Sequence, residues 1–599
     1  MAEIHFSQLI SYQARKYGDR TALCYRNDEQ NKWISISWNE FDAQVRNTAR
    51  ALYDSGVQEE QNIGIFSQNK PECFYVDFAL YANRAVAVPM YATSTAEQIE
   101  YIVNDAHIDT IFVGEQYQYD TALTVLKRSA ALKKIIVFDN TVKIESENSL
   151  YFADFLKTGE TSASQSEVDA RTARATAEDV ATLMYTSGTT GEPKGVVLPH
   201  SCFLEAMRIH PIRLPFMNEN DTSLCFLPLT HIFERAWSYL CLTLGVVINI
   251  NLRPAEIQRA VSEVRPTMMC SVPRFWEKVY AGIQEKIEGY SPVMVGVVAW
   301  AIAVGKKYNI KYLRENKRPP RFLRWKYRVA DKFVFSKVKE TLGIENGVMF
   351  PTAGAALSEN ICQFFRAIGV PITIGYGLTE SCATVCCFDR TDYVFDSAGK
   401  IMPDIQVKIG ADNEILLKGK TIFREYYNKP EANAQAFTAD GWFRTGDAGK
   451  IEGDTLFITE RLKDLFKTSN GKYIAPQQIE TRLAADKYIE QAAVIGDQRN
   501  YVTALIVPKI QQLQEYAKDE NIACETIEDL LKLPKIYDFI ADRVREAQKG
   551  MATYEQIKKF SLIAKDFSLE GGELTNTLKI KRMIISEKYK KLIDAMYKN

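Results

Sequence analysis

Short apolar runs alternate with longer amphipathic segments along the chain from Asn62 onward. The apolar runs are NIGIF, AVAVPM, DTIFVG and KKIIVFD, and the segments between them are PECFYVDFALYANR, AEQIEYIVNDAH and DTALTVLKRSA. The first set has the length of strands and the second the length and periodicity of helices. Pro71 falls where the first turn of a helix tolerates proline. Strands that alternate with helices predict βαβ units, a mostly parallel sheet and therefore an α/β fold.

The pattern changes between Gly399 and Ile458, where short alternating strands with turn signals predict a small β-rich subdomain. After Thr459 a charged stretch, ERLKDLFKTSNGKYIAP, precedes a compact α/β tail with the strands QAAVIGD and ALIVP. We therefore expect a large N-terminal domain at residues 1–460, with its β-rich part at about 398–460. A smaller C-terminal α/β domain is expected at residues 461–599.

Three other segments depart from this pattern. Lys157–Glu178 is polar and rich in small residues, and it is expected to be a surface excursion before the strand DVATLMY. The apolar run Val293–Val304 spans about 12 residues, whereas a bilayer crossing takes about 20. We expect it to form a buried helix, with a helix that dips into a lipid monolayer as the alternative. Arg318–Gly343 is a long insertion rich in Arg, Lys and aromatic residues, and one interpretation of it is a basic amphipathic helix pair touching anionic lipid or another subunit.

Composition narrows the class of protein. The chain has 599 residues, of which 46% are hydrophobic and 25% charged, as in an ordinary soluble protein of about three or four structural units. Lys and Arg total 74 against 75 Asp and Glu, so no overall positive field would attract nucleic acid. The 11 cysteines form no CxxC pair, which favours a reducing compartment over a disulfide framework or a zinc site. The first residues have no signal-peptide pattern, so a cytoplasmic location is expected.

The strongest local motif is TSGTTGEPKGV, Thr186–Val196, directly after the apolar run ATLMY. Three glycines, several hydroxyls and Lys194 in a loop after a strand can surround phosphate oxygens with N–H and O–H groups. The motif lacks the GK[ST] ending of a Walker A loop, which disfavours a P-loop kinase or ATPase. From the residues alone, a turn-rich surface loop is the competing interpretation.

This motif resembles the phosphate-loop signature of the adenylate-forming superfamily, which includes acyl-CoA synthetases, luciferases and peptide-synthetase adenylation domains. Further segments match the family's signatures in order up to Lys579, so the resemblance covers about two thirds of the chain. They are LPLTHIFER, FPTAGAALSE, GYGLTES, GWFRTGDAG, ERLKDLFK, KTSNGKYIAP and NTLKIKR. The resemblance implies the adenylate-forming enzyme fold, with a large N-terminal domain and a small mobile C-terminal domain.

The resemblance also implies roles for residues in the N-terminal domain. The loop residues facing the ATP phosphates would be Thr186, Ser187, Gly188, Thr189, Thr190, Gly191 and Lys194. His231 would stand where the acid meets the α-phosphate, and Ala353, Gly354 and Ala355 would lie against the adenine. Tyr376 and Gly377 would belong to the same nucleotide site, with Tyr376 stacked on the adenine. Thr379 would contact the phosphates, and Glu380 would hold Mg²⁺ together with Thr186.

The remaining implied roles lie toward the C-terminus. Asp447 and Arg461 would bind the ribose, Lys463 would mark the hinge, and Lys467 and Gly471 would face the thiol acceptor. Lys579 would reach the α-phosphate and the substrate carboxylate, although Thr577 and Leu578 precede it where the commoner family form is SGK. From the residues alone, His231 would be a hydrogen-bonded core residue, TGD a β-turn and NTLKIKR the basic start of a helix.

These parts predict a two-step ligase, in which a carboxylate attacks the α-phosphate of ATP and a thiol then displaces AMP. The segments HIFERAWSYLCLTLG and SVPRFWEKVYAGI and the long insertion Arg318–Gly343 resemble the long-chain acyl-CoA synthetase branch. The expected substrates are therefore a long-chain fatty acid, ATP and CoA, with Mg²⁺ as cofactor. An acyl-AMP ligase that serves a carrier protein and a non-catalytic binding protein of the same fold are the alternatives. Peripheral membrane contact and a homodimer stay open.

Overall fold

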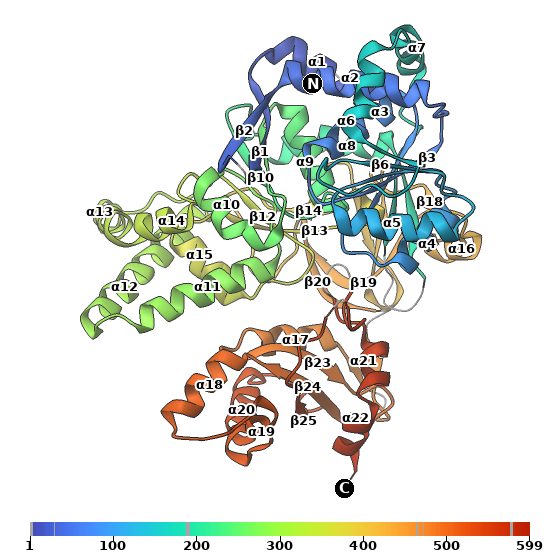
Figure 1. Cartoon of the computed structure of the whole chain (residues 1–599). Helices are drawn as coiled ribbons and strands as arrows, with labels where there is room; N and C mark the ends of the chain where they lie inside the picture. Colours follow the sequence, from blue (N-terminus) through green and yellow to red (C-terminus); the bar gives the residue numbers. More distant parts are fainter. Residues whose placement is uncertain are drawn as a thin grey trace.

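The computed structural model describes residues 4–28, 30–186, 192–462, 465–470, 472–568, 570–575 and 579–598. In Figure 1 the N-terminal part fills the upper half of the molecule, and the C-terminal domain, coloured orange to red, lies below it. Within the described ranges, the N-terminal part contains an eight-stranded sheet of order β18-β9-β8-β4-β3-β5-β6-β7. Its strands are β3 (Asn62–Phe66), β4 (Val86–Met90), β5 (Thr110–Val113), β6 (Lys134–Val137), β7 (Ser149–Tyr151), β8 (Val180–Thr186), β9 (Lys194–Pro199) and β18 (Glu425–Tyr426).

Helices connect the parallel strands of this sheet. They are α3 (Pro71–Ala82), α4 (Ala96–Asp105) and α5 (Gln116–Arg128), each between two strands of the sheet. β3 pairs in parallel with both β4 and β5, and β5 pairs in parallel with β6. Pro71 starts α3, and the Thr95 side chain caps α4 by accepting a hydrogen bond from the backbone N–H of Gln98. The predicted βαβ units are confirmed.

Two further sheets complete the described N-terminal part. One has eight strands in the order β12-β13-β14-β15-β20-β19-β17-β16, and the other has four in the order β10-β11-β1-β2. The first consists of β12 (Phe350–Thr352), β13 (Ile372–Tyr376), β14 (Cys386–Cys387), β15 (Gly399–Ile401), β16 (Gln406–Ile409), β17 (Glu414–Lys418), β19 (Phe443–Glu452) and β20 (Thr455–Arg461). The second consists of β1 (Thr21–Asn27), β2 (Lys32–Ser37), β10 (Thr222–Cys225) and β11 (Val247–Ile250). Short antiparallel strands thus occupy the region where the sequence predicts a β-rich part.

Other helices cover these sheets. They are α1 (Phe6–Tyr17), α2 (Trp38–Asp54), α6 (Phe152–Thr161), α7 (Gln165–Arg174), α8 (His200–Arg213), α9 (Ile232–Leu244) and α16 (Pro430–Ala436). The polar segment Lys157–Glu178 therefore contains the end of α6 and all of α7. Val168 of α7 is buried, and α7 packs against α2 and α3. This excursion contains a folded helix, α7, whose buried residue is Val168.

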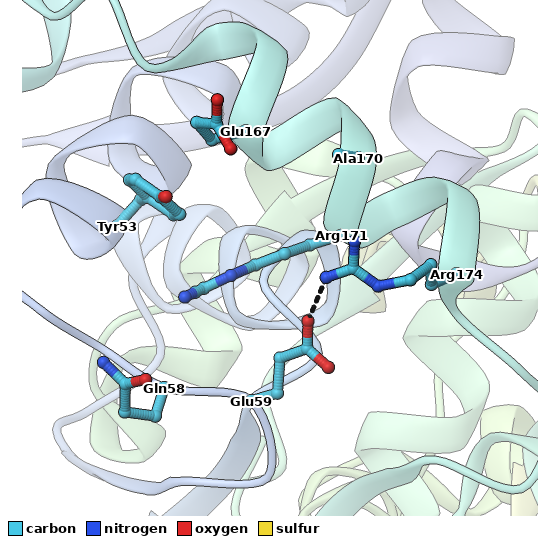
Figure 2. A pocket seen from close by; sticks show the side chains of 7 residues that line it. All are labelled: Tyr53, Gln58, Glu59, Glu167, Ala170, Arg171 and Arg174. Atoms are coloured by element: carbon cyan, nitrogen blue, oxygen red, sulfur yellow. Dashed lines mark hydrogen bonds and ion pairs between the residues drawn. The ribbon is translucent and has the colours of Figure 1, made fainter.

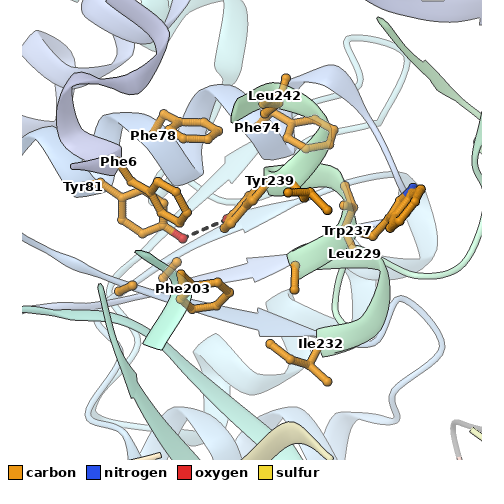
Figure 3. Packing of buried hydrophobic residues seen from close by; sticks show 14 of the residues in the cluster. Phe6, Phe74, Phe78, Tyr81, Phe203, Leu229, Ile232, Trp237, Tyr239 and Leu242 are labelled. Atoms are coloured by element: carbon orange, nitrogen blue, oxygen red, sulfur yellow. Dashed lines mark hydrogen bonds between the residues drawn. The ribbon is translucent and has the colours of Figure 1, made fainter. Parts of the chain in front are cut away.

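Aromatic side chains from distant segments form the core between α3, α8 and α9, as Figure 3 shows. Phe6, Phe78 and Tyr239 pack edge-on or tilted, with ring centroids between 5.1 and 6.1 Å apart. The hydroxyls of Tyr81 and Tyr239 are 2.8 Å apart. Burial of such large rings dominates the stabilisation of a core. This cluster fixes α9, and α9 begins directly after His231.

Helices α10 to α15 form an arm on the left of Figure 1. They are α10 (Ile257–Val264), α11 (Pro273–Glu288), α12 (Pro292–Gly305), α13 (Arg321–Ala330), α14 (Ser336–Leu342) and α15 (Glu359–Ala367). The π-helical segments η2 (Lys306–Leu313) and η3 (Asp331–Phe335) continue α12 and α13. The helix pair expected for Arg318–Gly343 is wrong, because α13, η3 and α14 continue without a break from Arg321 to Leu342. The expectation that Val293–Val304 is buried is wrong, because most of the N-terminal half of α12 is exposed.

The C-terminal domain is a small α/β unit. Its described strands are β21 (Phe466–Lys467), β22 (Tyr473–Ile474), β23 (Ile489–Ile495), β24 (Val502–Pro508) and β25 (Ile557–Leu562). Its helices are α17 (Pro476–Ala484), α18 (Ile510–Asp519), α19 (Ile527–Lys532), α20 (Pro534–Ala547), α21 (Arg582–Lys588) and α22 (Lys590–Tyr597). The strands QAAVIGD and ALIVP predicted from the sequence are β23 and β24.

Candidate active site

Several motif segments begin where neighbouring parallel strands end. β12 pairs in parallel with β13, and the bridges Ser223 to Met268 and Met268 to Met349 continue this parallel order back to β10. The segments after β10, β12 and β13 contain His231, Ala353–Ala355 and Gly377–Glu380 respectively. The carboxyl ends of parallel strands meet at one edge, which is where α/β sheets bind ligands. The strand order therefore brings three motifs that lie far apart in the sequence to a common edge.

Tyr376, the last residue of β13, is tied to Asp447 on β19. The Tyr376 hydroxyl donates a 2.6 Å hydrogen bond to Asp447 Oδ2. Arg461 is the register partner of Asp447 on β20, and its Nε lies 3.6 Å from Asp447 Oδ1. Burial, reinforced by the charge of Asp447, raises the pKa of Tyr376 well above its ordinary value, so the phenol keeps its proton. A ring, a carboxylate and a guanidinium are thus brought together, as the sequence predicts for an adenosine site.

Gly377 is held against the backbone that follows the short helix η4 (Thr379–Ser381). A Cβ atom at residue 377 would lie 1.3 Å from the carbonyl oxygen of Ala383. Only glycine fits this close backbone approach without moving the chain.

The Ala353–Ala355 segment, which follows β12, is held by a backbone hydrogen bond at its start. The N–H of Ala353 donates to the carbonyl of Ser271 at 3.2 Å.

Glu380 lies next to the base of the glycine-rich hairpin. The Tyr426 hydroxyl donates a 2.8 Å hydrogen bond to Glu380 Oε1, and Lys194 Nζ lies 5.0 Å from the centre of the Tyr426 ring. Thr186 and Lys194 are register partners on β8 and β9, so the hairpin base faces this cluster. Burial and the charge of Glu380 raise the pKa of Tyr426, and the charge of Arg461 opposes that rise. Tyr426 therefore lies among Lys194 of the hairpin base, Glu380 and the charge of Arg461.

The residues around Glu380 fit a nucleotide-bound magnesium ion. Among the described residues, no group of three or more His, Cys, Asp or Glu side chains could hold a metal by itself. Mg²⁺ commonly takes one or two carboxylates from the protein and the rest of its ligands from phosphate and water. Glu380 supplies one such carboxylate beside the base of the hairpin.

His231 caps helix α9. Its Nδ1 accepts a 3.2 Å hydrogen bond from the backbone N–H of Phe233, and its own backbone N–H donates to the carbonyl of Pro228 at 2.9 Å. Burial and the positive charge of Lys579 lower the pKa of His231 to about 4. A neutral imidazole that accepts through Nδ1 carries its proton on Nε2. His231 is therefore a neutral donor at physiological pH.

Lys579 comes from the C-terminal domain, yet its charge acts on His231. Its backbone N–H donates to the Thr575 hydroxyl at 3.0 Å, and its carbonyl accepts from the Thr575 N–H at 2.8 Å. The domain is held on α11 by ion pairs between Arg274 and Glu490 and between Lys487 and Glu288. This docking directs the predicted catalytic lysine toward the edge that contains His231.

The other predicted site residues divide into two groups. Ser187, Gly188, Thr189, Thr190, Gly191, Lys463 and Gly471 lie outside the described residues. Lys467 lies on the hairpin β21–β22, where its backbone N–H donates to Asp497 at 3.4 Å and its ammonium group is 5.3 Å from the ring of Tyr473. The structure thus places Lys467 within the C-terminal domain's own hairpin.

Sequence reasoning missed Tyr426 and Glu234. Tyr426 lies in REYYNKP, which has the composition of a turn and gives no sign of a contact with Glu380. Glu234 belongs to LPLTHIFER, and a carboxylate three residues after His231 on a helix was the available signal. It is fully buried, accepts from the N–H of Leu227 at 3.2 Å and from Ser238 at 3.3 Å, and burial raises its pKa to about 8.

A surface hollow between α2 and α7 is separate from these motifs (Figure 2). Arg171 donates to the Val57 carbonyl at 2.7 Å and lies 4.5 Å from the centre of the Tyr53 ring. Arg174 pairs with Glu59 at 2.5 Å. These arginines are occupied by structural contacts between the two segments, so the site is assigned to the strand edge instead.

Known proteins share this organisation. A family model described as AMP-binding enzyme matches residues 10–427, and one described as AMP-binding enzyme C-terminal domain matches residues 463–599. The chain is 32% identical over 586 residues to long-chain-fatty-acid–CoA ligase FadD15 of Mycobacterium bovis, covering 97% of this chain and 95% of that protein. It is 28% identical over 628 residues to long-chain-fatty-acid–CoA ligase ACSBG2 of Mus musculus, covering 98% and 92%.

The fold is also found in solved structures. The adenylation domain of a carboxylate reductase from Mycobacterium chelonae is similar with a TM-score of 0.75 and 19% identity, covering 100% of this chain and 92% of that chain. Together with the family models, which match most of the sequence, this similarity confirms the α/β fold that the motifs imply. The chain belongs to the AMP-binding enzyme family.

Proposed function

We propose that this protein converts long-chain fatty acids to acyl-CoA in two steps, through an acyl-AMP intermediate, with release of pyrophosphate and AMP. The observation that carries the proposal is the meeting of Tyr376, Asp447 and Arg461 at the strand edge that also contains His231, and the charge of Lys579 acting on His231 supports it. Relatives of nearly the same length as this chain are named long-chain-fatty-acid–CoA ligases, which supports the choice of acid and thiol.

The first step needs fixed positive charge. When a carboxylate attacks the α-phosphate, two anionic groups meet at one phosphorus atom, so cations and donors that are already in position lower the barrier. Lys579 would supply this charge from the C-terminal domain, and Lys194 would supply it from the hairpin base. A magnesium ion held at Glu380 would neutralise phosphate charge when bound.

His231 would bind and orient the acid. Because its pKa is lowered to about 4, the imidazole adds no charge and offers Nε2–H as a donor. Its Nδ1 is engaged by the N–H of Phe233, which fixes the direction of the ring. A neutral donor can hold a carboxylate oxygen without stabilising the ground-state anion as strongly as a cation would.

The second step needs a different arrangement of the C-terminal domain. A thiol that attacks the acyl carbon requires the space beside the α-phosphate into which Lys579 is directed. We propose that rotation near Lys463 withdraws Lys579 and brings the face around Gly471 to the thiol of CoA. We also propose that the protein acts in the cytoplasm.

The test separates the two half-reactions in the full-length protein. Pyrophosphate release is measured with fatty acids of increasing length, and acyl-CoA formation is measured from supplied acyl-AMP. Lys579→Ala is expected to lower adenylate formation by at least about 10²-fold while leaving the thioester step active. Lys590→Ala, an exposed change on α22, is the matched control.

Each alternative gives its own outcome. Equal loss of both half-reactions in Lys579→Ala would make this lysine structural. Acyl-AMP formation without transfer to CoA would favour a carrier-protein acceptor. Pyrophosphate exchange that is independent of fatty acid would contradict the proposed substrate.

A further inference from the structure

The N-terminal half of helix α12 exposes apolar side chains to solvent, Met294 and Val295 among them, and three of these side chains form a row. Val293, Val297 and Trp300 follow the i, i+4, i+7 spacing of a single helix face, and Val293 is 80% exposed. Val298, Ala301 and Val304 are buried, and Ala301 and Val304 belong to the apolar core of the arm. The exposed row is therefore left without a partner among the described residues.

A second apolar row lies on the neighbouring helix. Phe322 and Trp325 of α13 are 65% and 60% exposed, and Phe333 of η3 is 59% exposed. The rings of Phe322 and Trp325 stack with their centroids 6.0 Å apart. Because α12 packs against α13 and η3, the two rows lie on adjacent helices of the projecting arm (Figure 1). We call the exposed side of α12, η2, α13 and η3 the α12–α13 face.

Positive charge surrounds these rows. Residues 306–332 contain eleven Lys and Arg but two acidic residues, in a chain whose formal net charge is −1. The exposed basic residues are Lys306, Lys307, Lys311, Lys317, Arg318, Arg321, Arg328 and Lys332. Both acidic residues are already paired, Glu315 with Lys317 at 2.5 Å and Asp331 with Lys339 at 3.1 Å. The α12–α13 face is therefore apolar in its rows and cationic around them.

The helices are held in place by their inner side. The rings of Tyr308 and Tyr327 stack with centroids 4.0 Å apart at an angle of 11°, which joins η2 to α13. Asn309 donates to the carbonyl of Ala367 on α15 at 2.9 Å and to the Tyr327 hydroxyl at 3.2 Å. The helices of this face are thus in place before it meets a partner, so its affinity is not reduced by the cost of folding them on binding.

We infer that the α12–α13 face docks the protein on the surface of an anionic lipid bilayer. Aromatic and aliphatic side chains that enter the headgroup boundary, together with a cationic rim, are the two signals that peripheral binding requires. A symmetric pairing with a second copy would place this cationic face against itself, which like charges oppose.

The face lies on the membrane and does not cross it. Among the described residues, the helix Pro292–Leu313 is long and apolar enough to span a bilayer by length and composition. However, Val304 is buried against the protein, and Lys306, Lys307 and Lys311 follow within the same helix. A helix with one side packed on protein and several charges fits the interface rather than the bilayer core.

Sedimentation of the full-length protein with vesicles tests this inference. We expect binding to phosphatidylcholine vesicles that contain phosphatidylserine, weak binding to phosphatidylcholine alone, and release by high salt. Brominated lipids should quench Trp325 fluorescence, and Trp325→Phe should reduce that quenching. Equal binding to both vesicle types, or no binding to either, would overturn the inference.

Variants assign the binding to this face. Phe322→Ser combined with Trp325→Ser, and Arg321→Gln combined with Arg328→Gln, should each lower vesicle affinity about tenfold or more. Met583→Ser, which removes an apolar side chain of similar exposure from the C-terminal domain, is the control and should leave affinity unchanged.

Two further readouts distinguish lipid docking from misfolding and from dimer formation. Pyrophosphate exchange with a soluble short-chain acid should be unchanged in the double variants, which shows that they fold. The proposed catalysis and the docking can therefore fail separately. If the Phe322→Ser, Trp325→Ser variant instead converts a dimer to a monomer in sedimentation velocity, the face is a subunit interface and the inference is overturned.

Discussion

Replacing Glu234 with glutamine should stabilise the protein at neutral and alkaline pH. The side chain lies on α9, three residues after His231, is fully buried and accepts a hydrogen bond from the N–H of Leu227. Burial raises its pKa from the ordinary 4.5 to about 8. Between those values the folded protein keeps a proton that the unfolded chain releases. Unfolding therefore becomes easier as pH rises through this window.

The magnitude follows from the shift. Each unit of pKa difference corresponds to about 1.4 kcal/mol, so the unfolding free energy should fall by up to about 5 kcal/mol between pH 4.5 and pH 8 because of Glu234. Glutamine is neutral in both the folded and the unfolded state, so its contribution to the unfolding free energy does not change with pH. The stability difference between Glu234→Gln and the unmodified protein should therefore grow in favour of glutamine across the same window.

Urea unfolding at several values between about pH 5 and about pH 8 measures this difference, with Glu167→Gln, an exposed change on α7, as control. Infrared spectroscopy adds a direct readout, because a protonated carboxyl has its own C=O band, which Glu234→Gln should remove at neutral pH. Parallel stability profiles of Glu234→Gln and the unmodified protein, with no change in that band, would refute the reasoning.

Three other substitutions probe the core and the nucleotide site. Asp77→Ala should lower the unfolding free energy by about 3–5 kcal/mol, because it removes the carboxylate that lies 2.9 Å from the buried Arg235. Adding Arg235→Met should restore part of that loss, and urea titrations measure both changes. Gly377→Ala should nearly abolish pyrophosphate exchange with retained circular dichroism, because the new Cβ would meet the carbonyl of Ala383; normal exchange would contradict this. Asp447→Asn should raise the KM for ATP about tenfold or more with little effect on the KM for the acid, and equal changes would argue against a ribose contact.

The α/β core could be predicted because its signals are local. NIGIF and KKIIVFD are apolar throughout, as strands covered on both faces must be, and the helices between them show their own periodicity. The motif residues could likewise be recognised one at a time. Their contacts could not, because the hydrogen bond from Tyr376 to Asp447 depends on the strand order β13-β14-β15-β20-β19. No local pattern encodes that order.

The exposure of α12 shows a second limit of prediction from the sequence. An apolar run such as Val293–Val304 indicates that the segment will be buried away from water, but it does not indicate which surface will bury it. In the structure Ala301 and Val304 contact the arm, whereas Val293 and Trp300 face outward. The basic composition of the following segment was visible in the sequence, but its position beside this row required the helix pairing.

The C-terminal domain has to place Lys579 close to His231, although the contacts that hold the domain include a weak, exposed ion pair. Lys579 has to be close enough to His231 to lower the pKa of that imidazole, yet the ion pair between Lys487 and Glu288 that helps hold the domain is half exposed on both sides. Exposed ion pairs of this kind contribute about 0–1 kcal/mol each. Such contacts can select one orientation without locking it, because little free energy is lost when they break. A lysine that must face the phosphate in one half-reaction and leave in the next requires an attachment that can break, and a half-exposed ion pair such as that between Lys487 and Glu288 is consistent with the proposed two-step function.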